Sequence, residues 1–365
     1  MTRRMMELYS DFLISSFGQT SATMLAQLLL GEVSHDQVTR FLRQEEAFSR
    51  TLWKLAKPLV RQIEQEDGTL SVDDCVIPKP HSQENGVVEW HYDHTTGRTI
   101  RGICFITAFY GVTTPDQERL GVPVAGEVIV KKPVWDEKKQ NSVMKSPITK
   151  NEHYRHMLAQ CKANGVKFKY VLNDTWYTNP ENMTFVVERL GKHFVMAIKE
   201  NMSILICDES DVIQWKGKMR DLDIAEGQVR EVYINGIDFP VYVSRHVFKN
   251  EDGSSGILYL CSDDSSLTAN ETLAIYQKRW PVEEFHKSLK QNASLGKSPA
   301  STPACQIKHI LCSFYGHIKL EKLKIIRKEN HFAMRTKMYI AALKTSYEEL
   351  QRLRQQSENF ENSAA

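Results

Sequence analysis

The chain has 365 residues, of which 41% are hydrophobic and 25% are charged, and its formal net charge is only +2. This composition is that of an ordinary globular protein and argues against a disordered or collagen-like chain. No apolar run approaches the roughly 20 residues that a membrane-spanning helix needs, so we expect no membrane association.

The cysteines and the N-terminal residues give an indication of the cellular compartment. The seven cysteines are scattered and form no Cys-x2-Cys pair, which favours reduced thiols over a disulfide framework or a zinc site. The N-terminal residues lack an apolar stretch that leads to a small-residue cleavage site. We therefore expect a cytoplasmic protein.

The N-terminal region is predicted to be helical. An apolar-rich helix over 22–30 is expected to end at Gly31, and a capping box of Ser34 and Gln37 begins a second helix over 35–43. Two helices joined by a short turn that contains glycine are typical of a helix-turn-helix.

In a helix-turn-helix, Arg40 and Arg43 would face DNA. A helical hairpin without DNA contacts is the alternative interpretation.

The middle of the chain changes to a strand-like pattern. We predict, in order, strands over 70–77, 87–92 and 100–110, a helix over 151–164, a strand over 166–174, a helix over 180–190 and a strand over 193–199. This order is that of a ribonuclease-H-like mixed sheet, so we expect an α/β fold.

The following region is predicted to form β hairpins, with turns at Asn235–Gly236 and Asp252–Gly253. Helices are then expected over 303–328 and 332–356, with a frayed polar tail over 357–365. The expected organisation is a helical region over 1–67, the first part of the core over 68–200, a β-rich insertion over 201–262, a helix-bearing segment over 263–300 that completes the core, and C-terminal helices with a tail over 301–365.

Three carboxylates stand at positions where a sheet edge can bring them together. Asp74 (or its neighbour Asp73) lies on the first strand, Asp174 ends the fourth, and Glu283 lies on a later helix. A few oxygen ligands with open positions suit Mg²⁺, with Mn²⁺ as a substitute. Two such ions roughly 4 Å apart would promote phosphoryl transfer. Each carboxylate also has an ordinary interpretation, because strand-end aspartates are common turn residues and Glu283 can pair with Lys287.

The run Tyr276-x2-Arg279-x3-Glu283-x6-Lys290 adds an aromatic hydroxyl and two cations to the third carboxylate. On one continuous helix, these offsets fall within about 60° of one another. Pro281 interrupts this arrangement because proline removes a helix hydrogen bond and kinks the axis. The first two residues are therefore expected on a preceding turn.

The C-terminal third is basic, since residues 276–344 contain 14 lysines and arginines but only four acidic residues. Such a segment can contact DNA phosphates with a salt-dependent affinity. A solvated helical surface is the alternative.

His91 to His94 contain metal-ligand residue types in close order. Neighbouring residues on a strand point to opposite faces. We therefore expect hydrogen-bonded or surface roles for these residues.

The same residues carry a resemblance to a known family. Tyr-x2-Arg-x3-Glu-x6-Lys resembles the motif of the insertion sequence 4 group of bacterial DDE transposases. Residues 72–79 resemble the first-aspartate block of that group, which favours Asp74 as ligand, with Cys75 in the place of the usual threonine. Residues 171–177 resemble the second-aspartate block and assign Asp174.

The resemblance implies a ribonuclease-H-like core interrupted by a β insertion. It further implies cut-and-paste transposition by a synaptic homodimer that acts on double-stranded DNA, at terminal inverted repeats and at a target, in the bacterial nucleoid. The implied site consists of the catalytic metal ligands Asp74, Asp174 and Glu283 and of the phosphate-binding residues Tyr276, Arg279 and Lys290.

Two other functions fit the sequence less well. One is a metal-dependent nuclease with the same core that does not join strands. The other is a domesticated copy that only binds DNA.

Overall fold

The structure is a computed structural model, and it describes residues 2–93, 97–138, 140–208, 210, 212–249 and 253–364. The chain divides into two compact units. We call Glu45–His286 with Ser301–Pro303 the sheet unit. The helical unit consists of Met1–Gln44, Lys287–Ala300 and Ala304–Ala365.

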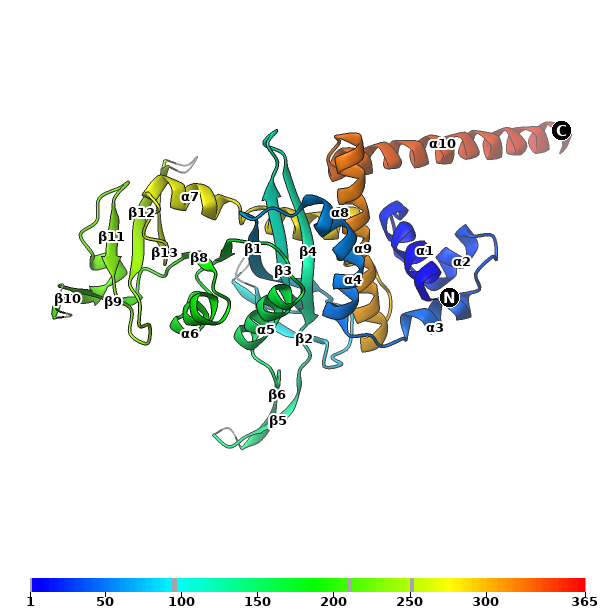
Figure 1. Ribbon diagram of the computed structural model, residues 1–365. Helices are drawn as coiled ribbons and strands as arrows, with labels where there is room; N and C mark the ends of the chain where they lie inside the picture. Colours follow the sequence, from blue (N-terminus) through cyan, green and yellow to red (C-terminus); the bar gives the residue numbers. More distant parts are fainter. Residues whose placement is uncertain are drawn as a thin grey trace. The chain divides into compact units, whose positions relative to one another are not determined.

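A mixed β-sheet forms the centre of the sheet unit (Figure 1). Its central strand β1 pairs antiparallel with β3 on one side and parallel with β7 on the other. The sheet continues from β3 to β4 in antiparallel pairing and from β7 to β8 in parallel pairing, while β2 pairs antiparallel with β3. The strands are β1 (Thr69–Pro78), β2 (Val88–Asp93), β3 (Arg98–Thr113), β4 (Arg119–Val128), β7 (Tyr170–Asn173) and β8 (His193–Ala197).

The sheet extends beyond β8 through residues predicted to form hairpins. β13 (Ser255–Ser262) pairs antiparallel with β8, and β12 (Val241–Lys249) and β11 (Val229–Val232) follow outward. The turn from β11 to β12 contains Gly236 at φ +87°, a conformation that glycine adopts without strain. β11, β12 and β13 were therefore predicted correctly. Asp252, in the second predicted turn, lies outside the described residues.

Several strands were missed from the sequence. β4 and the hairpin of β5 (Lys132–Asp136) and β6 (Asn141–Lys145) lie between the third predicted strand and the next helix. β4 contains a proline and two glycines, which weaken a strand signal. Its Pro123 is accommodated where the register with β3 shifts. β10 (Ile213–Lys218), which pairs with β9 (Ser203–Cys207) in a separate small sheet, was also missed.

Helices lie against both faces of the sheet. α5 (Lys150–Ala163) begins at a capping box of Thr149 and Glu152. Its buried residues recur at helical spacing, which predicts a core-facing stripe: Tyr154, Met157, Leu158 and Cys161. α6 (Pro180–Thr184), continued by a π-helical turn over Phe185–Arg189, is bonded to α5 through Arg155 and Asn182. The helices predicted over 151–164 and 180–190 are thus confirmed.

The remaining helices of the sheet unit precede and follow its strands. α4 (Phe48–Ile63) contacts β4, where the Gly126 N–H donates to Ser49 Oγ. α7 (Ala269–Gln277) contacts β8, β12 and β13. α8 (Pro281–Asn292) follows three residues after α7 ends.

The helical unit is built around α9 (Pro303–Arg327), whose central turns are almost entirely buried. The Tyr9 hydroxyl lies 3.0 Å from His309 Nδ1, and the buried Lys308 ammonium lies 4.8 Å from the centre of the Phe41 ring. A cation–π contact of this kind offsets part of the cost of burying the ammonium. The other helices are α1 (Thr2–Ser15), α2 (Ala22–Leu28), α3 (His35–Leu42) and α10 (His331–Ala364).

The predicted N-terminal helix pair is confirmed. Gly31 adopts φ +87° after α2, and Ser34 and Gln37 form the expected capping box of α3. The C-terminal prediction is corrected, because α10 continues to Ala364 instead of ending at 356. Among the helices of the described residues, none combines the length and apolarity that crossing a membrane requires.

Candidate active site

The two neighbouring aspartates of β1 point to opposite faces of the sheet, as consecutive strand residues do. Asp73 shares its face with Cys75, which lies opposite Phe105 in the antiparallel register. Asp74 shares the other face with Val76, which lies opposite Cys104. The two carboxylates therefore have different neighbours.

The face of Asp73 is covered by α8. The Phe285 and Phe109 ring centroids lie 5.0 Å apart, and those of His286 and Phe105 lie 5.6 Å apart. His286 Nδ1 lies 3.9 Å from Asp73 Oδ2. Helix α8, which carries Glu283 in its first turn, is thus on the same side of the sheet as Asp73.

Arg279 links two of the acidic residues. Its Nη1 lies 3.9 Å from Asp73 Oδ2, and its Nη2 donates to Glu283 Oε1. Its guanidinium also lies 5.5 Å from the ring centre of Tyr276. One cation therefore connects the carboxylate on β1 with the carboxylate on α8.

The four residues of the tyrosine–arginine–glutamate–lysine motif do not form one helical stripe. Tyr276 is near the end of α7, Arg279 is in the turn, and α8 begins at Pro281. This break at Pro281 was predicted, and the proline stands at the first position of α8, where its missing N–H costs no helix hydrogen bond. Lys290 is exposed in the last turn of α8, in the part of that helix that belongs to the helical unit.

Asp174 follows the last residue of β7, and its Oδ1 accepts a 2.9 Å hydrogen bond from the Trp176 N–H. β7 runs parallel to β1 with Ser71 opposite Leu172. The same offset, continued by two residues, brings Asp174 level with Asp73.

The electrostatics of Asp73 reflect this proximity. Burial first, and then the negative charges of Asp174 and Asp74, raise its pKa to about 7 against the opposing effect of Arg279. Neighbouring carboxylates oppose the ionisation of this carboxyl, and a bound cation would relieve their mutual repulsion.

The three carboxylates on this side of the sheet are not in direct contact as one group. Among the described residues, the oxygens of Asp73, Asp174 and Glu283 do not form a group with all ligand atoms within 4.8 Å of one another. Arg279 instead bonds Glu283 directly. The donor set fits divalent cations of the Mg²⁺ class by its chemistry, once the guanidinium leaves Glu283.

Asp74 has partners on the opposite face of the sheet. Lys150 Nζ and the Tyr177 hydroxyl each donate a 2.8 Å hydrogen bond to its two oxygens. The Cys104 thiol lies 3.7 Å from Oδ2. The structure therefore does not bring Asp74 together with Arg279 and Glu283, and the preference for it over Asp73 rests on the resemblance alone.

The other predicted DNA-binding residues lie in the helical unit. Arg40 and Arg43 are exposed on α3 and at its C-cap, while Val38, Phe41 and Leu42 are buried.

His91 is half-buried on β2. Burial first, and then the positive charges of Lys131 and Lys150, lower its pKa to about 4. His94 lies outside the described residues.

Sequence reasoning missed His286 and Lys150, the partners that distinguish the two aspartates. His286 stands three residues after Glu283 on α8, a spacing that gives neighbours on a helix. Lys150 directly follows the Thr149 cap of α5, but no local signal ties it to β1.

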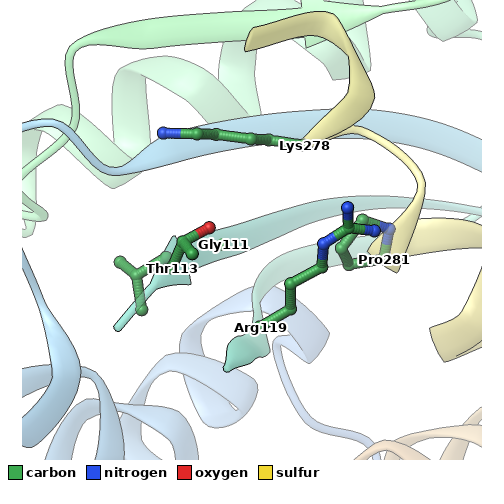
Figure 2. A pocket seen from close by; sticks show the side chains of 6 residues that line it. Gly111, Thr113, Arg119, Lys278 and Pro281 are labelled. Atoms are coloured by element: carbon green, nitrogen blue, oxygen red, sulfur yellow. The ribbon is translucent and has the colours of Figure 1, made fainter. Parts of the chain in front are cut away.

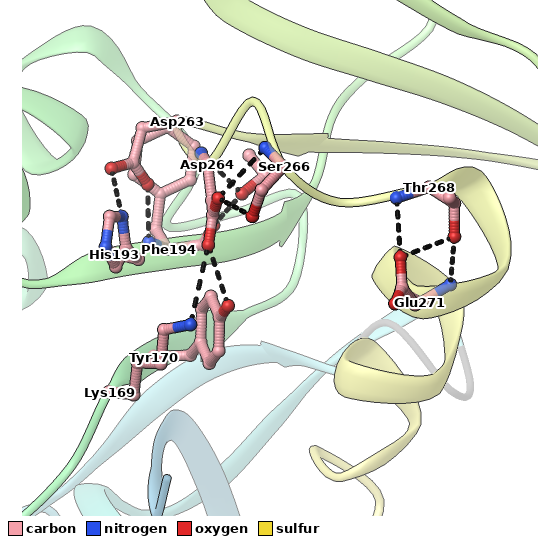
Figure 3. Close-up of polar contacts among 10 residues, drawn as sticks. Lys169, Tyr170, His193, Phe194, Asp263, Asp264, Ser266, Thr268 and Glu271 are labelled. Atoms are coloured by element: carbon pink, nitrogen blue, oxygen red, sulfur yellow. Dashed lines mark hydrogen bonds and ion pairs between the residues drawn. The ribbon is translucent and has the colours of Figure 1, made fainter. Parts of the chain in front are cut away.

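A second polar cluster was also missed, near the opposite ends of β7 and β8 (Figure 3). Asp263 accepts from the His193 ring and from the Phe194 N–H, each at 2.8 Å. Asp264 accepts from the Tyr170 hydroxyl at 2.8 Å. These bonds connect β7 and β8 to the segment that follows β13.

A small pocket opens where β3 ends and β4 begins, beside the turn between α7 and α8 (Figure 2). Arg119 and Lys278 both line it, together with Pro281. The pocket is cationic and contains none of the three candidate carboxylates.

Two models of known protein families match the chain. A model described as DDE superfamily endonuclease matches residues 1–217, and a model described as transposase DDE domain matches residues 148–311. The first match includes both β1 aspartates, and the second includes Glu283, while Asp174 lies in both. Curated proteins gave no match. Because the first match covers more than half of its length, the chain belongs to the DDE superfamily of endonucleases.

Proposed function

We propose that the chain is a DNA transposase of the insertion sequence 4 group, which cuts and joins transposon ends. The transposase DDE domain match and the four motif residues Tyr276, Arg279, Glu283 and Lys290 support this proposal. The observation that carries it is the arrangement of Asp73, Arg279 and Glu283 on one face of the sheet.

We propose that the core is ribonuclease-H-like. In favour of this, the strand order β4-β3-β1-β7-β8 has three antiparallel strands followed by two parallel ones. The core would comprise 68–200 and 263–300, with 201–262 as its β-rich insertion. Helical regions over 1–67 and 301–365 would flank it.

The catalytic carboxylates in this proposal are Asp73, Asp174 and Glu283. The pairing register and the α8 contacts favour Asp73 over Asp74 as the first of them. The three would hold two Mg²⁺ ions, or Mn²⁺ in their place. When bound, such ions supply activation of the attacking oxygen and stabilisation of the leaving oxygen.

Arg279 is proposed to bind either a carboxylate or a DNA phosphate. Without DNA, its guanidinium neutralises Asp73 and Glu283. A bidentate contact to a backbone phosphate would draw it away, leaving the carboxylates free for cations. Tyr276, which packs beside it, would orient the guanidinium.

Further DNA contacts are proposed for other cations. Arg119 and Lys278 line the pocket beside the turn that carries Arg279, so they would contact a phosphate of the same strand. Arg40, Arg43 and Lys290 would contact transposon-end DNA from the helical unit.

We propose that the synaptic complex is a homodimer and that α10 contributes to it. Along α10, Ile340, Leu343, Tyr347 and Leu350 recur at spacings of three and four residues, and each is about half exposed. This spacing is typical of helices that pair in coiled coils. The protein would act in the bacterial cytoplasm, associated with the nucleoid.

Incubation of the purified protein with DNA that carries the element's two terminal repeats, Mg²⁺ and a target plasmid tests the function. We expect excision at the ends and insertion products joined through the released 3′ ends, mapped by sequencing. Glu283→Gln should abolish both products while end binding persists. Glu284→Gln, one residue further along the same helix and exposed, is the matched control and should retain activity.

The alternatives give different results in this experiment. Nicked ends without joined products would indicate a nuclease that does not transfer strands. End binding without any cleavage by the unchanged protein would indicate a DNA-binding protein alone.

A further inference from the structure

A second cluster of ligand-type side chains lies in the helical unit, apart from the acidic site. His317, Glu321 and His331 are all buried, and each has a ligand atom within 4.8 Å of those of the other two. His317 and Glu321 are one turn apart on α9, so they share a face of that helix. His331 is the first residue of α10. The cluster therefore joins the end of one helix to the start of the next.

The spacing of these atoms is close to that of a coordination shell. His331 Nε2 lies 2.9 Å from Glu321 Oε2. Two ligands about 2.1 Å from one ion are about 3.0–3.4 Å apart in octahedral or tetrahedral geometry. This pair thus already has nearly the required separation, and a ring nitrogen of His317 lies within 4.8 Å of both partners. The two imidazole ring centroids lie 4.9 Å apart.

Neighbouring residues hold these side chains in orientations that suit an ion. Ser288 Oγ lies 3.0 Å from His331 Nδ1, which leaves Nε2 directed at Glu321. Asn292 donates to the same serine hydroxyl at 3.0 Å. Lys324 Nζ lies 3.2 Å from Glu321 Oε1, so the other oxygen, Oε2, faces the histidines. A hydrogen bond to the outer ring nitrogen is the usual support of a metal-bound histidine.

We propose that His317, Glu321 and His331 bind one divalent transition-metal ion of the Zn²⁺ class, with water as a further ligand. Two imidazoles and one carboxylate suit Zn²⁺ and similar ions better than Mg²⁺, which takes oxygen ligands. The ion fixes the corner between α9 and α10 and connects it, through Ser288, to α8. Its role is structural, because the free energy of metal binding adds to the free energy of unfolding of the helical unit. The proposal does not rest on the transposase function.

Metal binding by the full-length chain tests this site. The protein is stripped with a chelator, incubated with Zn²⁺ in excess Mg²⁺ to occupy oxygen-ligand sites, and desalted. We expect the unchanged protein to retain one more Zn²⁺ per chain than His317→Gln, Glu321→Gln or His331→Gln, as measured by elemental mass spectrometry. Zn²⁺ should also raise the unfolding temperature of the unchanged protein but not of these variants.

His309→Gln is the matched control, because His309 is also buried on α9 but bonds Tyr9 and the Ser294 carbonyl. It should retain the ion. Ser288→Ala keeps all three ligands and should weaken Zn²⁺ binding by about 10–100-fold. Co²⁺ in place of Zn²⁺ should give visible absorption bands that these ligand variants lack.

Equal Zn²⁺ content in the unchanged protein and the three ligand variants would overturn the proposal, as would loss of the ion in His309→Gln. If circular dichroism shows that a glutamine variant does not fold, His317→Cys decides, because a thiolate replaces one ligand with another. That variant must bind Zn²⁺ and must show the sulfur-to-metal absorption of bound Co²⁺, and absence of both contradicts the site.

Discussion

The two faces of β1 place adjacent carboxylates in opposite situations. Asp73 lies among other acids under α8, and the pKa of its carboxyl is raised to about 7, first by burial and then by Asp174 and Asp74. Asp74 lies under α5, where an ammonium and a phenol hydroxyl each bond one of its oxygens. The cations around Asp73 do not balance the negative charges there. The carboxylate of Asp74, by contrast, has hydrogen-bond partners at both oxygens.

This difference separates a site for a ligand from a structural contact. A carboxylate already bonded at both oxygens gains little from a cation, while one held beside like charges gains much. Folding maintains such unfavourable proximity only where the surrounding contacts are strong, which is common at functional sites. The face on which a strand residue lies thus decides between the two roles.

The largest expected effect comes from replacing each aspartate by asparagine and measuring DNA cleavage. Asp73→Asn should reduce the cleavage rate by at least about 100–1000-fold, a loss comparable to that of other transition-state-stabilising groups. Asp74→Asn should retain a measurable rate, because its carboxylate does not share a face with Glu283. Gel assays on end-labelled DNA with Mg²⁺ give both rates.

The assignment of the catalytic role to Asp73 is wrong if Asp74→Asn abolishes cleavage while Asp73→Asn cuts normally. End-binding affinity, measured in parallel, separates a loss of chemistry from a loss of DNA. In that case Asp74, which the family resemblance favours, would be the catalytic aspartate, and Asp73, which the geometry favours, would not.

The sequence predicted the acidic positions but not which of two adjacent aspartates matters. Strand alternation states that Asp73 and Asp74 face apart, yet which face α8 covers depends on contacts such as Phe285 with Phe109, between residues far apart in the chain. Lys150 and His286 were missed for the same reason. By contrast, the helix break at Pro281 and the cap at Ser34 are local, and both were predicted correctly.

The other features that were not predicted also depend on contacts between residues far apart in the chain. β4 was hidden by its proline and glycines, and the proline is accommodated by a register shift with β3. His317 and Glu321 share a helix face and were visible as an i, i+4 pair, but His331 joins them only through the turn between α9 and α10. Local rules identify elements, and tertiary contacts assemble sites.

A smaller effect is expected on stability, with opposite signs for the two aspartates in metal-free protein. Asp74→Asn should lower the free energy of unfolding by about 1–3 kcal/mol, because Lys150 loses its carboxylate partner in a partly buried place. Asp73→Asn should raise it by about 1 kcal/mol, since it removes a buried charge that Asp174 repels. Urea denaturation at neutral pH with a chelator present measures both.

A double-mutant cycle with Lys150→Met sharpens this result. The coupling energy between Lys150 and Asp74 should be about 1–2 kcal/mol, whereas that between Lys150 and Asp73 should be near zero. Equal couplings for the two aspartates would show that the faces are not electrostatically distinct.

The smallest effect is expected at Asp264. The pKa of this carboxyl is lowered, whereas that of Asp73 is raised. Burial alone would raise the pKa of Asp264, but hydrogen bonds from Ser266 and Tyr170 outweigh it and hold this pKa at about 2. Because the folded-state pKa is below the unfolded value, the ionised form stabilises the fold above about pH 4, and this contribution is lost as the pH falls toward 2. Solvent screening reduces the contribution to on the order of 1 kcal/mol.

Asp264→Asn should therefore unfold at lower urea concentration than the unchanged protein at pH 6, and the difference should shrink as the pH approaches 2. Asp263→Asn, at the adjacent position, is the matched comparison, because burial raises the pKa of Asp263 despite its bonds to Phe194 and His193. With the folded pKa raised, the ionised form costs stability as the pH rises, so the charge-dependent part of the difference has the opposite sign. If both variants showed the same pH dependence, hydrogen bonding would not distinguish these carboxylates, and the contrast drawn for β1 would lose its physical basis.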